Sequence, residues 1–135
     1  MKILIIILVL QITFTCAFSC TCVPRTPLQK LCESSIILSG RIGKSRVDGL
    51  TKYYDINIDE VYKTPTNFTS KSAIVTTPKS SAACGINLRK GTRYLISGQK
   101  SALNTISTTI CEYVSNLDSL DEARKSAILH LLKLQ

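Results

Sequence analysis

The chain of 135 residues contains no tryptophan, few aromatic residues (6%) and a single histidine, His130. One histidine excludes a multi-histidine metal site within the chain, and it confines any Cys–His or Ser–His catalytic device to that residue. No run of five like charges occurs, so the excess of 17 Lys and Arg over 9 Asp and Glu is not a basic tail. Because paired carboxylates and nucleophile motifs are also missing, we expect no enzyme activity.

The longest apolar run lies at the N-terminus and is too short to cross a membrane. Residues 3–14 are apolar apart from two polar side chains, whereas a spanning helix needs about 20 apolar residues. A lysine precedes the run and a small-residue motif ends at Ser19, which is typical of a secretory signal peptide cleaved before Cys20. A buried strand and a bacterial lipoprotein signal are the alternatives. We expect a signal peptide over residues 1–19, a secreted domain over residues 20–135, and no membrane span.

The chain has six cysteines, and whether they form disulfides depends on the redox compartment in which the protein folds. Cleavage after residue 19 leaves five of them, at Cys20, Cys22, Cys32, Cys84 and Cys111. In a small secreted domain this number predicts a disulfide framework with one odd thiol. The sequon at Asn67 predicts N-glycosylation, which agrees with the secretory route.

Short apolar and alternating segments dominate the middle of the chain. They predict five strands, over residues 36–43, 54–60, 72–77, 93–97 and 104–111. A turn is expected over residues 46–49, and helices over residues 28–35 and from Ser119 to the end, where Ser119 and Glu122 form a capping-box pattern. His130 is then a partly exposed helix residue. Five short strands followed by a helix favour a mostly β fold, a small closed barrel with the helix packed on it.

The predicted mature chain begins Cys20-Thr21-Cys22-Val23-Pro24, and Cys32 follows ten residues later. This start resembles the inhibitory domain of the tissue inhibitors of metalloproteinases, a family of netrin-like modules on an OB-type five-stranded barrel. The resemblance continues over residues 53–63, 84–85, 94–98, 108–111 and 118–120. It implies this fold, with a short N-terminal and a C-terminal helix, and a secreted inhibitor of extracellular zinc metalloproteinases.

The chemistry of a free N-terminal Cys20 agrees with such a function. Its α-amine and its carbonyl oxygen belong to one five-membered chelate ring, so they can take two coordination positions on a metal. A catalytic zinc keeps one position open for water, and occupying that position removes the nucleophile of the protease. The zinc belongs to the partner, and no cofactor of the chain's own is expected. Because the amine must be neutral and its ordinary pKa is about 7.7–8.0, binding should weaken as the pH falls.

The resemblance also assigns roles to further residues. It implies disulfides Cys20–Cys84 and Cys22–Cys111, which fix the first three residues to the domain at two points. Thr21 would point into the specificity pocket of the protease, and its small size favours broad selectivity. Val23 and Pro24 would continue along the substrate groove, with Ala82 and Ala83 on the other side of the cleft.

Two features depart from the family pattern. In the family Cys32 pairs with a cysteine beyond the terminal helix, and no cysteine follows that helix here. We therefore expect Cys32 to be free or bridged to another chain. We also expect the protein to have no counterpart of the second, C-terminal domain of the family.

Other functions remain open at this point. The same cysteines serve equally as a structural staple in a non-inhibitory netrin-like module that binds matrix or defence partners. Arg89, Lys90, Arg93 and Lys100 have two interpretations, a patch for sulfated polysaccharide or a solvated surface. Nucleic-acid binding is not expected, because the chain has few aromatic residues for base stacking and is predicted to be secreted.

Overall fold

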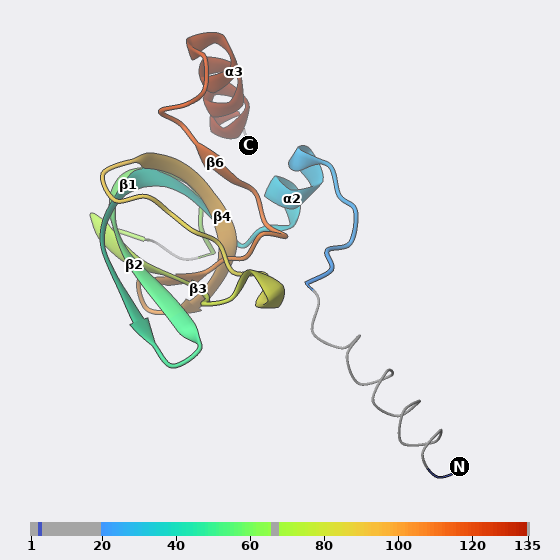
Figure 1. Cartoon of the computed structure of the whole chain (residues 1–135). Coiled ribbons are helices and arrows are strands. Elements are labelled where there is room, and N and C mark those ends of the chain that lie inside the picture. The colour runs from blue at the N-terminus through green and yellow to red at the C-terminus, as the bar shows by residue number, and fades with distance from the viewer. Residues whose placement is uncertain (1–2, 4–19, 66–67, 135) are drawn as a thin grey trace.

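The computed structural model describes residues 3, 20–65 and 68–134 (Figure 1). The predicted cleavage motif and the sequon at Asn67 lie outside the described residues. The elements, in chain order, are α2 (Pro27–Glu33), β1 (Ile36–Asp48), β2 (Thr51–Lys63), β3 (Ser72–Pro78), the short 3₁₀ helix η1 (Ser81–Ala83), β4 (Arg93–Ala102), β5 (Thr105–Ser107), β6 (Val114–Asn116) and α3 (Glu122–Lys133). None of the helices within these ranges combines the length and the apolar character that a membrane crossing requires.

All six strands belong to one sheet, with the order β1-β2-β3-β5-β4-β6. β1 also pairs with β4, so the hydrogen-bonded order returns to β1 after passing through five strands. The pairs are antiparallel except for β3 with β5. The mostly β fold with two helices is therefore confirmed, but the sheet has six strands where five were expected. The sixth, β6, has only three residues, too few to show an alternating pattern in the sequence.

The hairpin of β1 and β2 extends further than the sequence predicted. The expected turn over residues 46–49 is wrong, because β1 continues to Asp48 and pairs with Thr51. Gly49 takes the positive φ of 57° that the tight turn requires, a conformation that costs glycine little. Near the tip the Arg46 guanidinium lies 4.1 Å from the centre of the Tyr53 ring, and this contact supports the strands where no core lies beneath them.

Both faces of the first half of β1 are buried. Ile36, Leu38 and Ile42 belong to a core enclosed by the strands, while Ile37 belongs to a second cluster beneath the helices. The second cluster contains Leu31, Ile37, Leu95, Leu117 and Leu132, and so joins α2 and α3 to the sheet. Burial on both faces explains the continuous apolar run at the start of β1.

Each helix begins at a side-chain cap. For α2, the Thr26 hydroxyl accepts from the backbone N–H of Gln29 at 3.2 Å, and the Gln29 side chain accepts from the Thr26 N–H at 2.8 Å. For α3, the expected cap at Ser119 is wrong. The Asp121 carboxylate accepts from the Arg124 N–H at 2.7 Å, whereas the Ser119 hydroxyl donates to a preceding carbonyl. His130 is exposed on α3.

Candidate functional site

The segment from Cys20 to Thr26 has no helix or strand, and it leads directly into α2. Thr21, Val23 and Pro24 are exposed, and 73% of the Val23 surface is accessible. A valine that is exposed beside a proline, at the edge of a small domain, offers an extended apolar strip to a partner.

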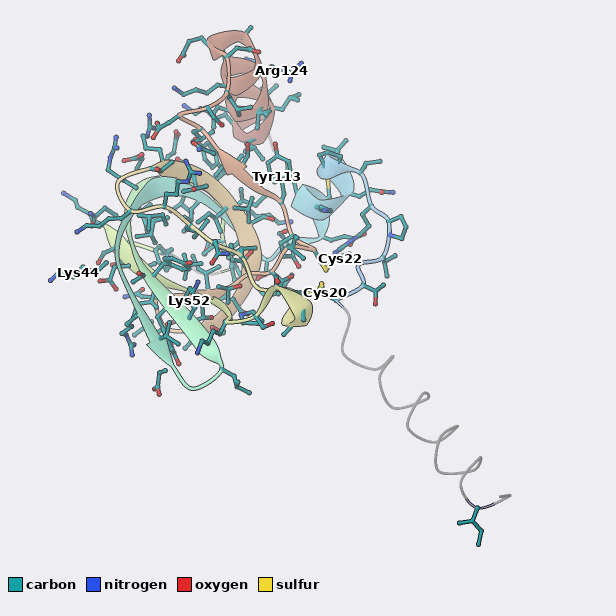
Figure 2. The ribbon with its side chains drawn as sticks, viewed as in Figure 1. Cys20, Cys22, Lys44, Lys52, Tyr113 and Arg124 are labelled. Carbon is teal, nitrogen blue, oxygen red and sulfur yellow. A yellow bond between two sulfur atoms is a disulfide. The ribbon has the colours of Figure 1, made fainter. Side chains whose placement is uncertain are left out.

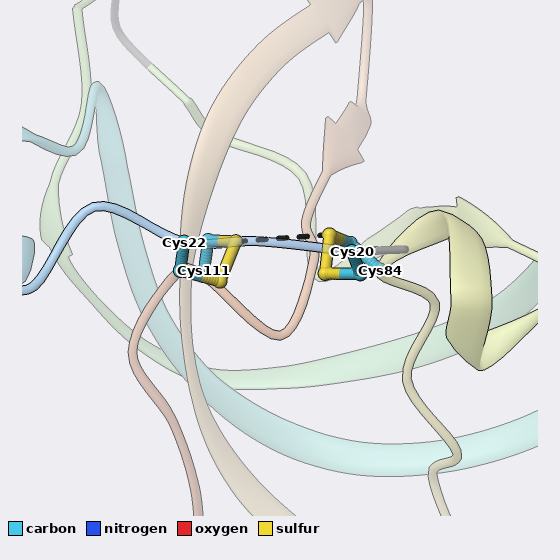
Figure 3. Close-up of side chains that lie close together, drawn as sticks. All are labelled: Cys20, Cys22, Cys84 and Cys111. Atoms are coloured by element: carbon cyan, nitrogen blue, oxygen red, sulfur yellow. Dashed lines mark hydrogen bonds between the residues drawn. A yellow bond between two sulfur atoms is a disulfide. The ribbon is translucent and has the colours of Figure 1, made fainter. Parts of the chain in front are cut away.

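Two disulfides hold this segment against the domain (Figure 3). Cys20 is bonded to Cys84, with 5.0 Å between their Cα atoms, and Cys22 is bonded to Cys111, with 5.3 Å. These are the pairs that the resemblance implied. The Sγ atoms of Cys84 and Cys111 lie 3.8 Å apart, and the Ile110 N–H donates to the Cys84 carbonyl at 2.9 Å. The two attachment points are therefore neighbours on the domain, and they hold the chain from Cys20 to Cys22 in place.

All four sulfur atoms lie within 4.8 Å of one another. A structural zinc site uses deprotonated thiolates, whereas each of these sulfurs is consumed in a disulfide. The sulfur cluster in this oxidised form is therefore a clamp on the N-terminal segment rather than a set of metal ligands.

Ala82 and Ala83 lie beside the clamp. They belong to η1 and are exposed, and the Ser80 hydroxyl accepts from the Ala82 N–H at 3.1 Å. Cys84 follows with a positive φ of 67°, which turns the chain sharply at the disulfide. The bond from Cys84 to Cys20 thus brings η1 and the N-terminal segment to the same edge of the molecule (Figure 1).

One exposed apolar residue at this edge was missed from the sequence. Ile110 is 56% exposed and directly precedes Cys111. Ile110 stood in a segment predicted as a strand, and an isoleucine in a strand is ordinarily expected to be buried, so the sequence did not mark it as an exposed residue. The structure instead ends β5 at Ser107, which leaves Ile110 in the loop that carries the second disulfide.

Cys32 is exposed on α2, and among the described cysteines it alone has no disulfide. The Lys63 ammonium donates to its backbone carbonyl at 2.6 Å, a contact that leaves the thiol uninvolved.

The four basic residues that a polysaccharide patch would use differ in their surroundings. Arg89 and Lys90 are exposed in the loop before β4, whereas the Arg93 guanidinium pairs with Asp59 at 2.9 Å. Lys100 lies seven positions further along the same strand. The structure thus gives no support to a polysaccharide site made of these residues.

One described side chain with a shifted pKa lies in the sheet. Burial raises the pKa of the Tyr62 phenol, and a hydrogen bond with the Glu60 carboxylate at 3.1 Å raises it further, against a lowering contact with Ser39. This group belongs to β2 and not to the edge around Cys20.

The sequence matches the family model of the tissue inhibitors of metalloproteinase over residues 18–134. The chain belongs to this family. Because its members are inhibitors, the expectation that the protein is not an enzyme is confirmed.

Several curated proteins are similar to the chain. A putative metalloproteinase inhibitor of Caenorhabditis elegans is 26% identical over 119 residues, which cover 80% of this chain and 75% of that protein. Metalloproteinase inhibitor 2 of Oryctolagus cuniculus is 28% identical over 123 residues, 82% of this chain and 62% of that protein. The human protein of the same name is 26% identical over 84% of this chain and 56% of its own length. The chain therefore matches less than two thirds of each mammalian relative.

Proposed function

We propose that residues 20–135 form a secreted inhibitor of extracellular zinc metalloendopeptidases, which inserts Cys20–Pro24 into the active-site cleft. Family membership supports the class of partner. The observation that carries the proposal is the exposed N-terminal segment held by two neighbouring disulfides. A segment ordered before binding loses little conformational freedom on association, which is how a small contact becomes tight.

The proposed zinc ligands are the α-amine and carbonyl oxygen of Cys20. In the precursor the nitrogen of Cys20 is an amide, which is a poor ligand, so signal-peptide cleavage after Ser19 would create the inhibitor. The amine and the carbonyl then displace the zinc-bound water that the protease needs as its nucleophile. The zinc is held by the protease, and the inhibitor supplies no cofactor of its own.

The remaining contacts follow from the exposed residues of the same edge. Thr21 enters the specificity pocket, which its short side chain fills only in part, and this favours several protease targets over one. Val23 and Pro24 extend along the substrate groove. Ala82 and Ala83 contact the opposite side of the cleft, and their small side chains make that contact weak.

Two further assignments belong to this proposal. We infer that the ring of five strands is the OB-type barrel of netrin-like modules, supported by the pairing of β1 with both β2 and β4. We also infer that Asn67 carries an N-linked glycan, because the secretory route would expose its sequon to glycosylation.

The test is a titration of a matrix metalloproteinase catalytic domain with protein processed to begin at Cys20. We expect inhibition that competes with substrate, with trypsin as an unaffected control protease. Cys32→Ala should inhibit equally well, because the Cys32 thiol is not bonded to the clamp. If the folded, oxidised protein inhibits no member of a panel of metalloproteinases, the proposal is wrong and a non-inhibitory netrin-like module is favoured.

A further inference from the structure

Arg25 links the N-terminal segment to two separate parts of the domain. Its Nη1 pairs with the Oε2 atom of Glu33, the last residue of α2, and its Nη2 donates to the carbonyl oxygen of Cys111 at 3.4 Å. Only 23% of the Arg25 side chain is accessible, against 57% for Glu33. The guanidinium is therefore inserted between the segment and the body of the protein rather than extended into solvent.

The contact with Cys111 places Arg25 next to the second disulfide. Cys111 is also the disulfide partner of Cys22, so two residues of the segment, three positions apart, are attached to one residue of the domain. The disulfide fixes a point, whereas a second attachment fixes the direction in which the chain leaves it. Val23 and Pro24 lie between the two attachments and are exposed.

We propose that Arg25 is a positioning residue, which sets the angle at which Cys20–Pro24 enters the protease cleft. This inference rests on the proposed inhibitory function. The planar guanidinium can hold the Glu33 carboxylate and the Cys111 carbonyl at the same time and in a fixed relation. A lysine would supply the charge but only a single point of contact, so it could not replace the arginine.

The alternative is an ordinary surface ion pair. Pairs with an exposed partner contribute little to stability, and the two disulfides hold the fold whether or not Arg25 is present. We therefore expect Arg25→Ala to leave the thermal unfolding midpoint almost unchanged while it loosens the segment. The loss then appears in binding, because the protease must order Val23 and Pro24 itself.

The test compares Arg25→Ala, Arg25→Lys and Glu33→Gln with two matched controls on α3. Arg124 pairs with Asp121 at 3.5 Å and Glu122 pairs with Lys125 at 3.2 Å, so Arg124→Ala and Glu122→Gln remove the same chemical groups elsewhere. Figure 2 shows Arg124 on α3, away from Cys20 and Cys22. We expect the three test variants to inhibit about tenfold more weakly and the two controls to inhibit like the parent.

Backbone ¹⁵N relaxation of the free proteins provides a readout that does not depend on inhibition. We expect the order parameter of the Val23 amide to fall from about 0.85 to below about 0.6 in the test variants alone. Unchanged order parameters in Arg25→Ala would overturn the inference, even if the parent protein inhibits nothing. Weaker inhibition by Arg25→Ala with full inhibition by Glu33→Gln would also overturn it, because Arg25 would then contact the protease directly. Parental behaviour of Arg25→Lys would show that charge alone suffices, against the proposed geometry.

Discussion

Removing either disulfide should cost the same free energy of unfolding, although the two bridges span different lengths of chain. Cys20–Cys84 has a sequence separation of 64 and Cys22–Cys111 one of 89. Taken alone, loops of these lengths stabilise a fold by about 4.3 and about 4.6 kcal/mol in the chain-entropy model. The two bridges are not independent, however, because their ends are adjacent in the sequence at one side.

When one bridge is present, the other closes a much shorter loop. The path from Cys22 runs back two residues to Cys20, across the first bond to Cys84, and on through a separation of 27 to Cys111. The closed loop has about 30 residues, for which the same model gives about 3.6 kcal/mol. Since the path is the same whichever bridge is removed, Cys20→Ala/Cys84→Ala and Cys22→Ala/Cys111→Ala should each lose about this amount. Removing both should lose about 8 kcal/mol, which is comparable with the whole stability of a domain, about 5–15 kcal/mol.

The assay is equilibrium unfolding in urea, with circular dichroism and fluorescence of the tyrosines followed together to check two-state behaviour. Cys32→Ala serves as the control, because Cys32 is exposed and unbonded among the described cysteines, and it should unfold like the parent. A difference of more than about 1 kcal/mol between the two double variants would refute the shared-loop reasoning. Such a result would mean that local packing at one bridge, rather than chain entropy, dominates its contribution.

Three further results are expected. Gly85→Ala should destabilise the domain by about 1–3 kcal/mol in urea unfolding, because the added Cβ overlaps the backbone carbonyl of Pro78. The control Gly43→Ala should be tolerated, since its Cβ makes only ordinary contacts at 3.6 Å. Equal stabilities of the two variants would contradict this prediction. Thr21→Gly should raise the inhibition constant moderately, because it removes pocket contacts but keeps the chelate, and a complete loss of inhibition would mean that Thr21 does more than fill a pocket. The affinity should fall about tenfold per pH unit below the pKa of the Cys20 amine, because protonation removes the lone pair that binds zinc, and the ordinary pKa of an α-amine is about 7.7–8.0. An affinity independent of pH from 6 to 8, after correction for the protease alone, would argue against the amine as ligand.

The elements that a local pattern determines could be predicted from the sequence. The alternation along residues 54–60 and the apolar run at Ile36 mark β2 and β1, because burial on one face or on both leaves a period in the sequence. The extension of their hairpin to Asp48 could not be predicted. It depends on cross-strand pairing and on the stacking of Arg46 over Tyr53, contacts that exist only once both strands are formed.

The N-terminal cap of α3 was predicted at the wrong residue because two neighbouring side chains can both cap a helix. Ser119 and Asp121 are both good capping residues, and the sequence pattern favoured Ser119 because Glu122 stands three positions on. The structure starts the helix two residues later, so that the Asp121 carboxylate caps it while the Ser119 hydroxyl bonds to Asn116.

The candidate site was only partly visible in the sequence. The exposed start at Cys20 was recognisable by its motif, but five cysteines leave the pairing open, so the pairs could be expected only from the family. Arg25 joins the site through a tertiary contact with the Cys111 carbonyl, and Ile110 lies there because its loop is held to Cys84, so no local sequence pattern identifies either residue. Of the two interpretations of the basic residues near Arg93, the polysaccharide patch gains no support, since Arg93 is paired with Asp59, a partner 34 positions away in the sequence.

The central claim is that the free amine of Cys20 binds the zinc of the protease. The most direct test places one alanine before Cys20 and titrates a matrix metalloproteinase with this form and with protein that begins at Cys20. The extension turns the amine into an amide and obstructs the cleft, while both disulfides and the fold remain, as peptide mapping and circular dichroism would establish. We predict that the extended form fails to inhibit at concentrations where the processed form inhibits completely. Equal inhibition by the two forms would contradict the chelation mechanism.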